Sequence, residues 1–257
     1  SVVGISTNTI NQALPMSKTG QTITFSNFLK QYAQANSTLI FQFKFIKHPN
    51  TTAPTSSFII ETSTAGYSID QLTSGAIYLA DPGPIHSIYF SASNSEVLAL
   101  TTFTITLIPE DALTQNSNIT IQFPSEMQIA SAPSTTSCVL VAGLYTNSDA
   151  KCGVTGSILT ISGIYIQDYP GQTMISITVD GVTLPSSTKP SSPFIISTVD
   201  GLNGAIVDQA YTATFTAIPA QLDPQHVMIT PDSQIVGEVT RYAFQIRNTN
   251  PIPIGGK

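Results

Sequence analysis

The chain has very little charge and no tryptophan. Only 9% of its 257 residues are charged, against about 25% in a typical soluble domain. Its nine Lys and Arg residues are spread singly and the net charge is −6, so we expect no groove for nucleic acid. No apolar run approaches the roughly 18 residues of a membrane span, so we expect none. Hydroxyl and amide side chains supply the polar surface instead, which is typical of extracellular β proteins.

Residue patterns for catalysis and for cofactor binding are also missing. His86 and His226 follow Asp-Pro at matching points of an internal repeat, which indicates a structural role. No serine lies in a nucleophile elbow, and neither cysteine has a base near it in the sequence. The acidic residues match no calcium loop, although a calcium site at the edge of a sheet stays open. We therefore expect no enzyme, no catalytic residue, no metal and no cofactor.

Cysteine is scarce: the chain has only Cys138 and Cys152. In a chain rich in Ser and Thr we interpret them as a disulfide, with two free buried thiols as the alternative. Three N-glycosylation sequons, at Asn36, Asn50 and Asn118, agree with an extracellular location. A chain of this composition would contain two or three such triplets by chance, so they only corroborate the compartment.

What the sequence does contain is a long internal repeat. The shift that places Gly20 on Gly156, which we call the repeat offset, aligns GQTITFSNF with GSILTISGI and PNTTAPTSSFIIET with PSSTKPSSPFIIST. The same offset places Val2 on Cys138 and Met16 on Cys152, so an apolar pair in the first copy matches the two cysteines of the second. This match supports pairing of the cysteines with each other.

Short alternating or β-branched runs fill both copies, and Gly, Pro, Asn or Asp separates most of them. The segment NFLKQYAQ has helical propensity, but its repeat partner GIYIQDYP favours a strand end and loop. We predict an all-β chain of two tandem immunoglobulin-like β-sandwich domains, with no long helix. The expected strands are residues 22–25, 39–45, 58–62, 76–80, 86–90, 102–108, 118–123, 158–162, 174–179, 194–198 and 211–217.

The two copies are unequal in length. The expected domains are an incomplete repeat at residues 1–95, a complete repeat at 96–235, and a C-terminal strand at 236–257. The first copy lacks a counterpart of Thr101 to Thr136, which includes the first strand and the NITIQFP strand. The C-terminal segment VTRYAFQIRNTNPIPIGGK resembles that first strand, with Phe244 aligned on Phe103. It contains no counterpart of NITIQFP, so the first domain either does without that strand or receives residues beyond Lys257.

This imbalance predicts that the C-terminal strand of one molecule completes the N-terminal domain of the next by β-strand addition. Because donor and acceptor lie on different surfaces, identical subunits would form a head-to-tail helical filament. A longer tandem chain has the same geometry, and chance chain ends are the remaining alternative. The donor strand residues are Thr240, Tyr242, Phe244 and Ile246.

Two Pro-spaced hydroxyl runs are suited to carrying O-glycans, with unmodified loops as the alternative. We therefore expect covalent glycans on a secreted or cell-surface protein. A different class of function, a carbohydrate-binding or adhesive module, stays open, although the aromatic residues sit mostly at core-type strand positions. The candidate O-glycosylation residues are Thr51, Thr52, Thr55, Ser186, Ser187, Thr188, Ser191 and Ser192.

The succession TFTITLIPEDALTQNSNITIQFP, a cysteine pair, ILTISG, and SITVDGVTLPSSTKPSSPFIIST resembles the tandem β-sandwich repeats of protist surface proteins, such as those of ciliates and algae. The resemblance covers nearly the whole chain in one and a half to two copies, and Val2 and Met16 depart from its cysteine pattern. It implies an extracellular, glycosylated structural protein of a filament or mastigoneme-like coat. The strand addition is similar to donor-strand complementation in bacterial pili, as an analogy of mechanism only.

Overall fold

The structure of the chain is a computed structural model that describes residues 2–4, 16–29, 32–43, 46–130, 139–142, 145–147, 150–211, 213–222 and 224–252. Its described residues contain no α-helix, and η1 (Pro224–His226) is a short 3-10 turn. The strands are β1 (Val2–Gly4), β2 (Met16–Thr19), β3 (Thr22–Phe25), β4 (Phe41–Phe43), β5 (Phe58–Thr64), β6 (Tyr67–Ala76), β7 (Gly83–Ala92), β8 (Leu100–Pro109), β9 (Asn118–Gln122), β10 (Gln128–Ile129), β11 (Val139–Ala142), β12 (Lys151–Thr155), β13 (Ile158–Ser162), β14 (Ile175–Thr183), β15 (Ile195–Val199), β16 (Ile206–Ala210), β17 (Val227–Pro231) and β18 (Tyr242–Ile246).

The chain divides into two compact units, Ser1–His48 and Pro49–Lys257. In the first unit β1 pairs with β4 and β2 pairs with β3, both antiparallel. The ring of Phe41 stacks on Phe25 at 5.4 Å and meets Phe28 edge-on at 5.7 Å. No side chain whose exposure is described in this unit is fully buried, so the described residues of this unit form only a small apolar cluster.

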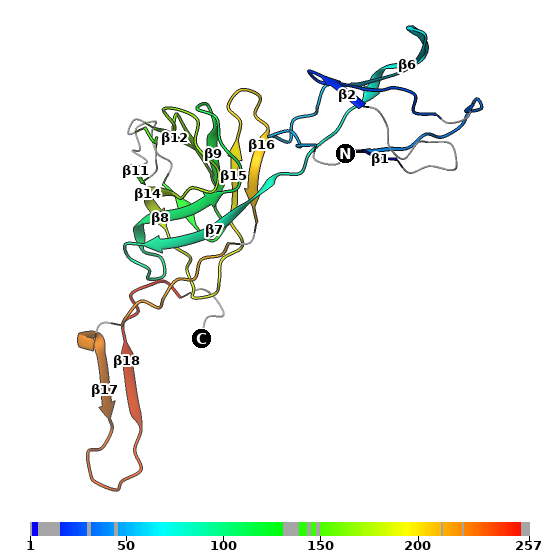
Figure 1. The fold of residues 1–257 in the computed structure, drawn as a ribbon. Helices are drawn as coiled ribbons and strands as arrows, with labels where there is room; N and C mark the ends of the chain where they lie inside the picture. Colours follow the sequence, from blue (N-terminus) through cyan, green and yellow to red (C-terminus); the bar gives the residue numbers. More distant parts are fainter. Residues whose placement is uncertain are drawn as a thin grey trace. The chain divides into compact units, whose positions relative to one another are not determined.

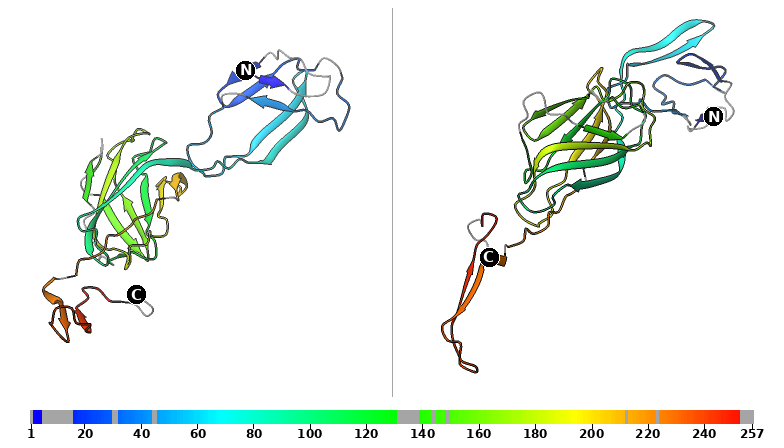
Figure 2. Two further views of the ribbon diagram at one scale, coloured as in Figure 1. Left: turned by 90° about the horizontal axis from the view of Figure 1, so that it is seen from below. Right: turned by 90° about the vertical axis from the view of Figure 1, so that its left-hand side faces the viewer.

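Ten strands of the second unit form one large mixed sheet that is nearly closed into a barrel (Figures 1 and 2). Their order is β10-β14-β8-β7-β16-β15-β9-β13-β12, and β11 pairs with β14 beside β10. β16 pairs with β7 in parallel, with Asp208 opposite Gly83, while the other pairs of this sheet are antiparallel. The segment β7 therefore lies in the same sheet as β8, although it precedes the expected boundary at residue 95.

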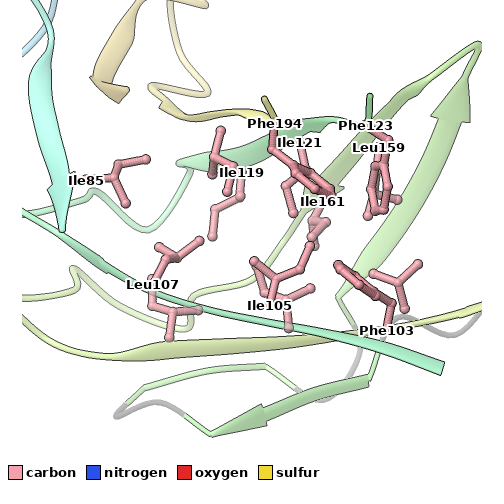
Figure 3. Packing of buried hydrophobic residues seen from close by; sticks show 14 of the residues in the cluster. Ile85, Phe103, Ile105, Leu107, Ile119, Ile121, Phe123, Leu159, Ile161 and Phe194 are labelled. Atoms are coloured by element: carbon pink, nitrogen blue, oxygen red, sulfur yellow. The ribbon is translucent and has the colours of Figure 1, made fainter. Parts of the chain in front are cut away.

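Strict alternation along β8 builds the core of this sheet. Phe103, Ile105 and Leu107 are completely buried, and the threonines between them are half-buried on the opposite face. Successive side chains of a strand point to opposite faces, so this pattern supplies one apolar face. Figure 3 shows these three side chains directed toward the buried residues of β9 and β13 and toward Phe194, which directly precedes β15. The buried partners include Ile119, Ile121, Phe123, Leu159, Ile161, Phe194 and Ile196.

The outer face of β8 carries hydroxyl groups in place of charges. Thr104 Oγ1 lies 3.2 Å from Thr178 Oγ1, and Thr106 Oγ1 lies 3.4 Å from Ser176 Oγ, both across the ladder between β8 and β14. Threonine is β-branched and favours strands, and its hydroxyl bonds with a cross-strand neighbour. This arrangement explains how a chain with few charged residues keeps polar groups on the outside of its sheet.

The expected all-β class and the absence of a long helix are confirmed for the described residues. The strands form one large mixed sheet, and the tandem immunoglobulin-like arrangement stays a prediction. Two expected strands are wrong, because residues 77–80 and the described part of 211–217 are not in strands. Residues 211–217 include buried Phe215, whose carbonyl accepts a hydrogen bond from the Ser191 N–H at 2.8 Å. The alternating sequence of residues 211–217 therefore reflects the burial of side chains in an irregular segment beside a loop. Such a segment and a strand can have the same alternating pattern.

Candidate assembly surfaces

The repeat in the sequence is matched by strand register in the structure. In β2–β3, Met16 lies opposite Phe25, and in β12–β13, Cys152 lies opposite Ile161. Both pairs are related by the repeat offset, and the three pairs that follow in each hairpin obey the same offset. The hairpins therefore have identical pairing although their sequences differ at most positions.

The β5–β6 hairpin corresponds to β15–β16, with β5 at the repeat offset and β6 at a shift two residues longer. Glu61 lies opposite Gln71, as Ser197 lies opposite Gln209. In both hairpins the register then shifts before the turn. Their large side chains differ sharply in exposure: Phe58 and Ile60 are more than half exposed, while the corresponding Phe194 and Ile196 are buried.

The β17–β18 hairpin corresponds to β7–β8 at a slightly different shift, which places Phe90 on Ile229 and which we call the hairpin offset. Ile229 lies opposite Phe244, as Phe90 lies opposite Ile105. The three neighbouring pairs obey the same offset, which includes the pairing of Pro231 with Tyr242. The C-terminal hairpin thus has the register of β7–β8, whose strands come first in chain order among those of the large sheet.

The loops of these two hairpins also share hydrogen bonds. Thr101 Oγ1 accepts the N–H of Asn94 at 3.0 Å, and Thr240 Oγ1 accepts the N–H of Ser233 at 3.0 Å. Both loops contain a left-handed residue at the same point, Leu98 with φ 59° in one and Gly237 with φ 82° in the other. A loop of equal length fixes the register of its hairpin, so these contacts support the hairpin offset independently of the strands.

The alignment of Phe244 on Phe103 is therefore wrong by two residues. Tyr242 corresponds to Phe103, Phe244 to Ile105, and Ile246 to Leu107. The error came from matching one phenylalanine to another, whereas the loop between the strands determines the register. A shift of two residues keeps the same face of the strand, so the predicted apolar face is unchanged.

That apolar face is exposed in the C-terminal hairpin. Tyr242, Phe244 and Ile246 are 59%, 70% and 57% exposed, whereas their counterparts on β8 are 0% exposed. Directly opposite residues on paired strands share a face, so Val227 and Ile229 of β17 belong to the same surface. We call these five residues the hairpin face. The sequence prediction missed the contribution of β17, and the equal loop lengths were the signal that would have revealed it.

The sequons lie at positions of differing exposure. Asn36 and Asn50 are exposed, and Asn36 has a positive φ of 66° in a turn. Asn118 is half-buried as the first residue of β9. Cys152 lies half-buried in β12, while Cys138 is outside the described residues, so the disulfide stays a prediction.

The candidate O-glycosylation residues also differ in accessibility. Ser186, Ser187 and Thr188 are exposed, and Thr51, Thr52 and Thr55 are half-buried. Ser191 is buried, and its hydroxyl accepts the N–H of Phe215 at 3.0 Å and donates to the carbonyl of Ser192 at 2.8 Å. A glycan at Ser191 would have to displace these contacts.

Ser192 is exposed and contacts a carboxylate. Its hydroxyl and its N–H both donate to Glu126 Oε1, at 2.9 and 3.0 Å. The hydrogen bond from the Ser192 hydroxyl is the largest cause of a lowered pKa of Glu126, because it stabilises the charged carboxylate. Ser192 therefore already has a structural role in the loop.

The described residues contain no helix long and apolar enough to cross a membrane, and no group of three or more His, Cys, Asp or Glu that could hold a metal ion. No protein-family model, curated protein or solved structure matches the chain. The hairpin face and the repeat are therefore the features of the chain that bear on its function.

Proposed function

We propose that the chain is a structural subunit of an extracellular, glycosylated filament, built from tandem immunoglobulin-like repeats. Identical subunits polymerise head-to-tail when the β17–β18 hairpin of one copy supplies the counterpart of β7–β8 to the first repeat of the next. The hairpin contains no counterpart of β9, so the first repeat either does without that strand or receives it from residues beyond Lys257. The observation that carries the proposal is the hairpin face. The β17–β18 hairpin has the register of β7–β8. The side chains of its hairpin face are exposed, whereas the corresponding side chains of β8 are buried.

The partner strand follows from the same correspondence. In the large sheet β8 pairs with β14, and Ile105 lies opposite Ile177. The counterpart of β14 at the repeat offset is β4, since β1–β4 has the register of β11–β14. We therefore expect Phe244 of one copy to lie opposite Phe41 of the next.

Burial of the hairpin face supplies the driving force. Burying Tyr242, Phe244 and Ile246 contributes roughly 1.5–3 kcal/mol for each side chain, or on the order of 5–9 kcal/mol. Because β17 and β18 are already paired, little conformational entropy of the backbone is lost on docking. Donor and acceptor surfaces differ, so the contact is heterologous and extends into a filament unless it closes a ring.

The test is a charge placed on the hairpin face. Phe244→Asp should abolish polymerisation, because docking would bury an unpaired carboxylate among apolar groups. The matched control is Gln245→Asp, which adds the same charge on the opposite face of β18. Size-exclusion chromatography with light scattering and negative-stain imaging measure the outcome.

Filaments that persist in Phe244→Asp would contradict the proposal. A monomeric wild-type chain that binds an immobilised glycan would favour the carbohydrate-binding or adhesive alternative. Residues before Ser1 in a longer tandem chain could supply the same hairpin covalently. In that case the purified longer chain should be monomeric. Phe244→Asp should leave its first unit, Ser1–His48, folded, because a different hairpin would pair with β4.

A further inference from the structure

One carboxylate in the large sheet is buried and accepts a hydrogen bond on each of its oxygens. Asp208 on β16 is 0% exposed. Its Oδ2 accepts the Thr198 hydroxyl at 3.1 Å, and its Oδ1 accepts the N–H of Asp111 at 3.2 Å. The N–H of Asp208 donates to Thr198 Oγ1 at 2.9 Å. A buried carboxylate is tolerated only when it is bonded in this way.

The first repeat contains two of these three bonds. Thr62 Oγ1 donates to Asp70 Oδ2 at 3.2 Å, and the N–H of Asp70 donates to Thr62 Oγ1 at 3.2 Å. Thr62 and Asp70 correspond to Thr198 and Asp208 in the matched hairpins. Asp70, however, is exposed, and the described residues place no backbone N–H on its Oδ1.

The C-terminal hairpin carries the residue that corresponds to the missing donor. Asp111 follows Leu107 of β8 by the same number of residues as Asn250 follows Ile246 of β18. The hairpin offset that relates β7–β8 to β17–β18 therefore relates Asp111 to Asn250. The acids Glu110 and Asp111 are replaced by Thr249 and Asn250, so this segment brings no carboxylate close to Asp70.

We infer that Asp70 is a docking residue that accepts the backbone N–H of Asn250 from a second copy of the chain, and that it thereby fixes the register of the donated hairpin. The inference rests on the proposed function. The hairpin face alone permits a slip of two residues, because alternate residues of a strand share a face. A slipped hairpin would cover Asp70 without placing the Asn250 N–H on its Oδ1, and loss of the matched donor is unfavourable for a covered carboxylate.

The register is measured by engineered disulfides between copies. The pairing of Thr178 with Thr104 in the large sheet predicts that position 42 of one copy faces position 243 of the next. The double variant Gln42→Cys with Ala243→Cys therefore reports the correct register. Gln42→Cys with Arg241→Cys reports a slip of two residues.

In these backgrounds Asp70→Ala should shift cross-linking from the 42–243 pair to the 42–241 pair. It should also raise the critical concentration for polymerisation about tenfold or more, as expected for loss of a hydrogen bond to a charged group. Asp70→Asn keeps an Oδ1 acceptor and should retain the correct register. Glu61→Ala removes an exposed carboxylate from the facing strand β5 at a position paired with Gln71, and should change neither quantity.

The outcomes separate the two proposals. If Phe244→Asp abolishes polymerisation but Asp70→Ala changes neither the register nor the critical concentration, the role of Asp70 is refuted and the filament proposal stands. If Phe244→Asp still polymerises, both are refuted. Because Asp70 is exposed in the subunit, circular dichroism and thermal unfolding of Asp70→Ala monomers should match the wild type. A loss of folding there would overturn the docking role in favour of a structural one.

Discussion

Asp208 shows how one residue can link the stability of the large sheet to pH. Burial raises the pKa of its carboxyl to about 6 from an ordinary value of 3.8, and the carboxylates of Asp111 and Glu110 contribute in the same direction. The hydrogen bonds from Thr198 and from the N–H of Asp111 oppose this shift, because they favour the charged form. Desolvation has the larger effect, so between about pH 4 and about pH 6 the folded chain holds a proton that the unfolded chain has lost.

The free energy of unfolding should therefore fall as pH rises from about 4 to about 6, by about 2–3 kcal/mol from this group. Asp208→Asn imitates the protonated form and should remove that part of the pH dependence. Urea unfolding at several pH values between 4 and 7 measures it. The control is Asp180→Asn, an exposed residue that accepts the Thr102 hydroxyl. An unchanged slope in Asp208→Asn would show that this carboxyl does not control the transition.

At the scale of strands and hairpins, the sequence predicted the positions of several strands and the match between two hairpins. Alternation located β8, β9, β13 and β14, because each buries one face and leaves threonines on the other. The repeat related Met16 to Cys152 correctly, as the identical hairpin registers show. Alternation does not determine which strands become neighbours, so neither the parallel pairing of β16 with β7 nor the near closure of the sheet was predicted.

The candidate site was predicted only in part, for a related reason. The apolar residues of β18 were visible as an alternating run. The role of β17 and of Asp70 depends on hydrogen bonds between segments that are distant in sequence. Such bonds leave no local pattern. In the sequence this aspartate is marked only by the recurrence of SIDQ at residues 68–71 as IVDQ at residues 206–209.

The turn shared by β2–β3 and β12–β13 provides a test of local geometry. Gly156 has a φ of +62° and Gly20 a φ of +59°, and a Cβ at either position would meet no other atom within 4 Å. Gly156→Ala should therefore lower the free energy of unfolding by about 1 kcal/mol through backbone strain alone. Gly153→Ala lies in β12 with equal space around its Cβ and no positive φ, so it should have little effect. Equal losses in chemical denaturation would exclude strain at the turn as the cause.

At the scale of the whole molecule, burial among the described residues is concentrated in the large sheet. Phe103, Ile105, Ile177 and their neighbours have no exposed surface, whereas β5, β6, β17 and β18 present large apolar side chains to solvent. Segments with few buried contacts open easily, while amides in a packed core exchange only on global unfolding.

Hydrogen exchange should therefore distinguish a subunit from an assembly. In the Phe244→Asp variant, amides of β8 and β14 should be strongly protected, and those of β5, β6, β17 and β18 should exchange fast. In wild-type filaments the second group should become protected, while the first stays unchanged. Mass spectrometry of matched peptides measures both. Equal rates in filaments and subunits would contradict docking through these strands.

The five residue pairs that already join β17 to β18 have a mechanical consequence. A connector that is folded before it docks needs no refolding after it is pulled out. The proposed filament, when broken by shear, should expose intact hairpins at one class of end and open repeats at the other, and such ends should rejoin without an enzyme or an energy source. A material built in this way would heal after fracture, at a rate set by how often its broken ends meet.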